Sequence, residues 1–110
     1  MTGALDRFAW PWAGLIGGPV LWYAAHDLAF YLSAVNCRYP FIVPAIHLVA
    51  FLGALLCGLL SYRARLPDEP AAALRQETFG AMIGAGAAAL FALAIAWQGL
   101  AVLAYSGCER

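Results

Sequence analysis

Three long apolar stretches, separated by short polar segments, dominate the chain. They cover residues 12–35, 41–62 and 79–105. A helix needs about 20 predominantly apolar residues to cross a bilayer, because the hydrocarbon core is about 30 Å thick and a helix rises about 1.5 Å per residue. The pattern therefore predicts an all-α integral membrane protein. It forms one domain over residues 1–110, with three transmembrane helices in an antiparallel up-down-up bundle.

Prolines and glycines indicate where these helices begin and bend. Pro11 suits the first turn of a helix, whereas Gly17-Gly18-Pro19 lies inside the first stretch and predicts a kink near Gly17. Only a few residues join the first two stretches, so their helices should form an antiparallel hairpin. Asp68 or Glu69 could cap a further helix that starts at Pro70 and runs into the third stretch. That helix would then project beyond the bilayer.

The composition agrees with a membrane protein. Hydrophobic residues make up 65% of the chain and charged residues 11%, whereas soluble domains carry about 25% charged residues. The longest polar connection, residues 63–76, leaves no room for a soluble catalytic domain. We therefore expect no enzyme activity from the chain by itself. Its formal net charge of zero suggests no nucleic-acid partner.

The basic residues predict an orientation in the bacterial inner membrane. All six are arginines, and they are distributed unevenly over the two sides. The positive-inside rule puts the N-terminus and second loop in the cytoplasm, and the first loop and C-terminus in the periplasm. The first stretch is too long for a cleaved signal peptide and is expected to be retained. The N-terminal and second-loop arginines are Arg7, Arg63, Arg65 and Arg75; the others are Arg38 and Arg110.

Two of the three cysteines fall on the same predicted side. Cys37 follows the first stretch and Cys108 follows the third. In an oxidising compartment they could form a disulfide, which would tie the first loop to the end of the third helix. The alternatives are two free thiols or bridges to another protein. Cys57, in the second stretch, is interpreted as a small core residue.

Glycines at four-residue spacing predict close helix packing. Gly14 and Gly18 form one pair, and Gly80 and Gly84 form another. Small residues at this spacing let helix backbones approach within a bilayer. The contacts could lie within the chain or against a partner protein.

Polar side chains recur at one depth in the three stretches. His26 and His47 lie eleven residues before and ten after Cys37, and Gln98 lies ten before Cys108. All three are therefore about 15 Å along their helices from the same membrane face. Asp27 adds a carboxylate there. Tyr23 and Tyr31, one turn on either side, could donate hydrogen bonds to it.

Several roles for this polar level are open. It could be an interhelical hydrogen-bond cluster that fixes the helix register, which requires no cofactor. His26 and His47 could instead be the two axial ligands of a haem b. The tyrosines, histidines and aspartate could also bind a quinone or pass protons. Copper fits less well, because no methionine lies near the two histidines, and no resident metal site is predicted.

The segment from Gly18 to Trp22, followed by His26, Tyr31 and Cys37, resembles a recurring bacterial pattern. It is similar to small uncharacterised three-span membrane proteins with Gly-Pro-x-x-Trp in their first helix and a cysteine after it. Genes for these proteins often lie near those for haem-copper terminal oxidases. The resemblance implies an accessory or assembly subunit of a respiratory complex, whose partners are its larger membrane subunits and the lipid bilayer. The alternative is a small electron-transfer protein that uses His26 and His47. Small multidrug pumps, which have four helices, fit less well.

Overall fold

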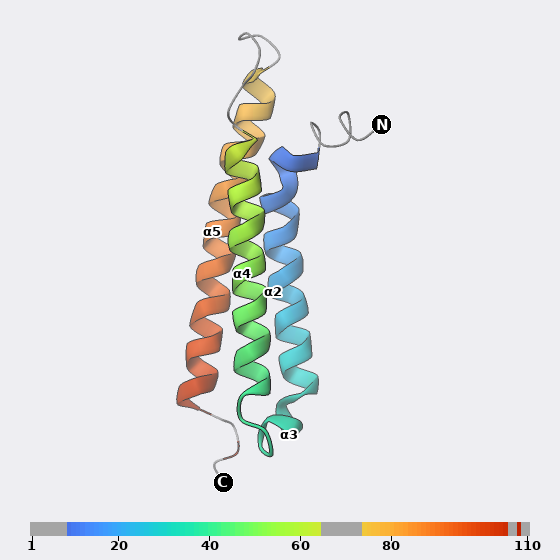
Figure 1. The fold of residues 1–110 in the computed structure, drawn as a ribbon, viewed down its shortest axis with the longest axis vertical. Helices are drawn as coiled ribbons and strands as arrows, with labels where there is room; N and C mark the ends of the chain where they lie inside the picture. Colours follow the sequence, from blue (N-terminus) through green and yellow to red (C-terminus); the bar gives the residue numbers. More distant parts are fainter. Residues whose placement is uncertain (1–8, 65–73, 106–107, 109–110) are drawn as a thin grey trace.

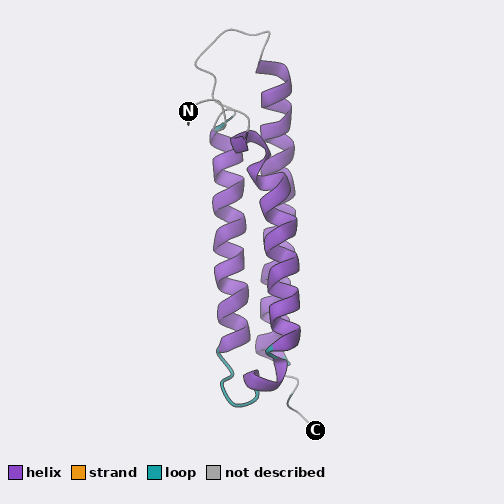
Figure 2. Ribbon diagram, turned by 90° about the vertical axis from the view of Figure 1, so that its right-hand side faces the viewer, coloured by secondary structure: helices purple, strands orange, loops and turns teal. Residues whose placement is uncertain are grey.

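The computed structural model describes residues 9–64, 74–105 and 108. Within these residues all regular secondary structure is helical, and there is no strand. Figure 1 shows the three long helices lying side by side, with α4 running opposite to α2 and α5, and Figure 2 shows the loop of residues 37–41 at one end of the bundle. The elements are a short 3-10 helix η1 (Trp10–Trp12), α2 (Ala13–Tyr31), α3 (Ser33–Asn36), α4 (Ile42–Arg63) and α5 (Leu74–Ala104).

The first apolar stretch is divided into two helices. Helix α2 runs through Pro19 without interruption, and the break comes at Leu32. There the Ser33 hydroxyl donates a hydrogen bond of 2.8 Å to the carbonyl of Phe30, a local bond of the kind that competes with the helix ladder. The bend expected near Gly17 stays a prediction.

Helices α4 and α5 agree closely with the second and third apolar stretches. Helix α4 has 22 residues and α5 has 31. At about 1.5 Å per residue, α5 is about 46 Å long and exceeds the roughly 30 Å of a hydrocarbon core. The cap expected at residues 68–70 lies outside the described residues.

Among the described residues, two helical segments are long and apolar enough to cross a membrane. They are Ile42–Arg63 in α4 and Thr78–Ala104 in α5. Helix α2 falls short of the same criterion because glycines, Pro19 and the polar pair His26 and Asp27 lower its apolar character.

Small side chains fill the centre of the bundle. Alanines from all three long helices are almost completely buried, and Ile95 of α5 lies among them. Such residues let the helix backbones approach closely, which replaces the hydrophobic driving force that is missing between helices in lipid. Leu21, Trp22 and Phe51 pack around this core.

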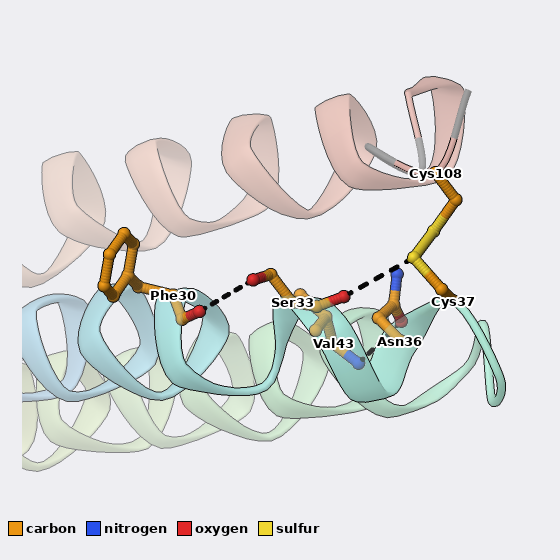
Figure 3. Close-up of a disulfide and its surroundings, with 6 residues drawn as sticks. All are labelled: Phe30, Ser33, Asn36, Cys37, Val43 and Cys108. Carbon is orange, nitrogen blue, oxygen red and sulfur yellow. Dashed lines mark hydrogen bonds between the residues drawn. A yellow bond between two sulfur atoms is a disulfide. The ribbon is translucent and has the colours of Figure 1, made fainter. Parts of the chain in front are cut away.

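A disulfide closes one end of the bundle (Figure 3). It joins Cys37, which follows α3, to Cys108, with their Cα atoms 5.6 Å apart. This is the pairing that the sequence predicts. Beside it, the buried Asn36 accepts a hydrogen bond of 3.3 Å from the backbone N–H of Val43 in the first turn of α4. The end of α3 is thus joined to both α4 and the segment after α5.

Candidate functional site

The three long helices converge at a junction opposite the disulfide. Ser61 of α4 is 0% exposed there. Its hydroxyl accepts a hydrogen bond of 2.7 Å from the N–H of Gly14 and donates one of 3.3 Å to the carbonyl of Trp10. No sequence motif includes Ser61. Its sequence position, which puts it at about the same membrane depth as Gly14, is the only feature that could have indicated its role.

Gly14, Gly18, Gly80 and Gly84 all have contacts within the chain. A Cβ atom on Gly14 would collide with the carbonyl oxygen of Gly84, and one on Gly80 would lie 3.0 Å from the Trp12 ring. A Cβ on Gly18 would lie 3.2 Å from the Phe91 ring. These glycines therefore pack α2 and η1 against α5. Gly86 differs, because nothing lies within 4 Å of its Cβ position.

His47 is enclosed between α4 and α5. It is 4% exposed, and a Cβ on Gly99 would lie 3.1 Å from the Cβ of His47. Its Nδ1 lies 2.9 Å from the carbonyl oxygen of Val43. A carbonyl only accepts, so Nδ1 carries the hydrogen in this bond, and in a neutral imidazole Nε2 keeps the free lone pair.

The helix register puts the predicted polar residues at similar depths. Leu21 of α2 lies against Gly53 of α4, which runs in the opposite direction. Asp27 is six residues after Leu21, and His47 is six residues before Gly53. Both residues therefore lie at the same distance along the bundle from this contact. On α5, Gln98 precedes the glycine that His47 contacts. The side chains share a level but not one set of surroundings.

The structure does not gather these side chains into one buried cluster. His26 is exposed and stacks on Trp22, with 5.8 Å between ring centroids. Tyr23 and Tyr31 are also exposed, and within the described residues neither makes a hydrogen bond to Asp27. The reason is rotation around the helix. Ala25 faces the core, and the next residue is turned by about 100° from it.

Two polar groups at this level have no partner in the described part of the chain. Gln98 is half-buried, and its Oε1 is buried without a hydrogen bond. Asp27 is half-buried and makes no hydrogen bond or ion pair there. His47 and Ser61, by contrast, make hydrogen bonds within the bundle.

The arrangement bears directly on the haem and metal hypotheses. The two histidines lie in different surroundings, one on the outside of α2 and one enclosed against α5. Among the residues that the structure describes, no group of three or more histidine, cysteine or acidic side chains could hold a metal ion.

Comparisons with protein-family models, curated protein sequences and solved structures found no match to this chain.

Proposed function

We propose that α2 is a third membrane span, beside α4 and α5, in the bacterial inner membrane. Its packing along both helices supports this, because Gly14 lies against Gly84 and Leu21 against Gly53. A helix held along most of its length by two spanning helices lies at their depth. The Cys37–Cys108 disulfide supports a periplasmic location for that end, since disulfides persist in oxidising compartments. The N-terminus is then cytoplasmic.

In this membrane the chain acts as a small non-catalytic accessory or assembly subunit of a respiratory complex, and the complex is a haem-copper terminal oxidase. One observation carries the subunit role. The bundle buries its small residues, while large apolar and aromatic side chains of all three long helices face outward. Such an outer surface suits contact with lipid and with the helices of larger subunits. The resemblance of the first helix to proteins encoded near oxidase genes supports the choice of complex.

Co-purification tests this role. The chain carries an affinity tag, is expressed at its natural level and is extracted in mild detergent beside an untagged control strain. We expect oxidase subunits in stoichiometric amounts, and less assembled oxidase in a deletion strain. Isolation of the chain without any respiratory subunit, together with normal oxidase assembly in the deletion strain, would contradict the proposal.

A haem or quinone site is the second candidate, and one observation favours it. The bond from His47 Nδ1 to a carbonyl leaves Nε2 as the nitrogen that could ligate a metal or accept a hydrogen bond. His47 is nonetheless enclosed, so a porphyrin could reach it only after the surrounding helices moved. A reduced-minus-oxidised visible spectrum of the purified chain, made with ample haem supply, tests this candidate. A colourless protein would exclude haem.

A further inference from the structure

The side of α2 that faces away from the bundle carries a regular stripe. Its members recur at intervals of four, three, four and four residues, which keeps them on one face of a helix. Val20 is 59% and Tyr23 61% exposed, and Asp27 is half-buried among its neighbours. We call this stripe the Asp27 face. It consists of Ile16, Val20, Tyr23, Asp27 and Tyr31.

The carboxyl group is the unusual feature of this face. Ionisable residues within membrane spans almost always face a bundle interior or a water-filled cavity, and they pair with another polar group. Asp27 is on the outer side of α2, at the depth of the buried His47, and has no such pair within the described residues. A second helix packed against the Asp27 face would enclose Asp27 between two helices.

Neither this chain nor a second copy offers a strong cation at that depth. All six basic residues are arginines, and all lie outside the three apolar stretches. His26 is adjacent in sequence, but its ring stacks on that of Trp22. The Trp22 ring in turn packs against Phe91 of α5, with 6.0 Å between the ring centroids. The stacking directs the imidazole toward the α5 side of α2 and away from the Asp27 face.

We propose that the Asp27 face docks a transmembrane helix of a larger subunit, and that this helix carries a lysine or arginine level with Asp27. The inference deepens the proposed function and rests on it, because the partner is a subunit of the same complex. Charge complementarity selects the occupant, since ionisable residues within a membrane pair with one another and a cation is the partner that complements the Asp27 carboxylate. The exposed Tyr23 and Tyr31 lie one turn on either side of the ion pair.

Site-specific photo-crosslinking in the membrane tests the location of the partner. A benzophenone amino acid replaces Val20 on the Asp27 face or, as the matched control, Leu90 on the exposed side of α5. The Gly14–Gly84 contact puts the two positions at the same depth. We expect Val20 to crosslink to a transmembrane peptide that contains a lysine or arginine, identified by mass spectrometry. A crosslink to a second copy of the chain, or to a helix without a basic residue, would overturn the proposal.

Substitution of the carboxylate tests the charge. We expect Asp27→Asn to lower the yield of crosslinked partner about tenfold or more, because it leaves the partner's cation unpaired, and Asp27→Glu to retain most of it. Equal yields from Asp27→Asn and the unchanged chain would overturn the inference.

The two proposals fail in different ways. Co-purified oxidase subunits that crosslink only from Leu90 would leave the accessory role intact and refute the Asp27 face. A crosslink from Val20 to the basic helix of a membrane protein outside the respiratory chain would keep the docking chemistry and refute the respiratory role.

Discussion

The backbones of α2 and α5 are in direct contact where Gly14 meets Gly84. A side chain on Gly14 would collide with the carbonyl oxygen of Gly84, and one on Gly84 would lie 2.6 Å from the carbonyl oxygen of Pro11. Ser61 of α4 adds its hydroxyl to the same point. One end of the bundle is therefore held by backbone contact and hydrogen bonds. The other is held by the Cys37–Cys108 disulfide.

The Gly14–Gly84 contact predicts that Gly84→Ala destabilises the bundle. The new methyl group would meet the carbonyl oxygen of Pro11 and, at 2.8 Å, the Ser61 hydroxyl, so the helices would have to separate. Overpacking of this kind costs about 1–3 kcal/mol. The measurement is equilibrium unfolding in detergent micelles, followed by helicity.

Gly86→Ala is the matched control on the same helix. Nothing lies within 4 Å of its Cβ position, so the gain in helix propensity of about 0.8–1.0 kcal/mol should show as unchanged or raised stability. Equal effects of the two substitutions would contradict the packing argument.

The hydroxyl of Ser61 predicts a second effect at the same junction. Gly14 is the second residue of α2, where a helical N–H has no acceptor within its own helix. Ser61→Ala removes that acceptor, and we expect a loss of about 1–3 kcal/mol with faster hydrogen exchange at the Gly14 amide. Ser33→Ala, at an exposed hydroxyl, should change stability by less than about 0.5 kcal/mol. An unchanged exchange rate at Gly14 in Ser61→Ala would count against the bond.

The contrast between the two histidines gives a third prediction. His47→Ala leaves a cavity against Gly99 and removes the donor to Val43, so we expect it to destabilise the bundle by about 2 kcal/mol or more. His26→Ala removes only an exposed ring stacked on Trp22 and should cost less than about 1.5 kcal/mol. Thermal unfolding of both variants in the same detergent compares them. Similar losses would mean that His26 is also a packed residue.

Helix positions could be predicted from the sequence far better than helix rotation. The apolar stretches located both ends of α4 and the end of α5 to within a residue, because a long uninterrupted apolar run is itself the signal, whereas α5 begins at Leu74, five residues before its stretch. The side of each helix that faces the core is harder to predict. A helix that is apolar on every side carries no stripe to distinguish the core from the outer surface. The depth shared by Asp27, His47 and Gln98 follows from counting residues, but the outward position of His26 depends on how Ala25 and Gly18 pack.

The Ser61 hydrogen bond and the helix break at Leu32 could not be predicted from a sequence pattern. The Ser61 bond to Gly14 joins residues 47 positions apart, and it forms only once the backbones of α2 and α5 have met. The break comes at Leu32, next to the Ser33 hydroxyl, whereas Pro19 was the expected source of irregularity. The cysteine pair was easier to predict, because two cysteines beyond the ends of parallel helices lie at one end of the bundle.

The disulfide supplies the last prediction, which joins stability to orientation. Its cysteines are 71 positions apart, and the chain-entropy model assigns a crosslink of that length about 4 kcal/mol. Helices that persist in the unfolded state within a micelle shorten the flexible part of this loop, so we expect Cys37→Ser to cost clearly less, about 2 kcal/mol. Cys57→Ala, at a free thiol inside the bundle, is the control that leaves the crosslink intact. In cells, a maleimide reagent that cannot cross the inner membrane should label Cys108 in the Cys37→Ser variant, because the freed thiol then faces the periplasm. Labelling only after the membrane is permeabilised would put this end of the bundle in the cytoplasm and reverse the proposed orientation.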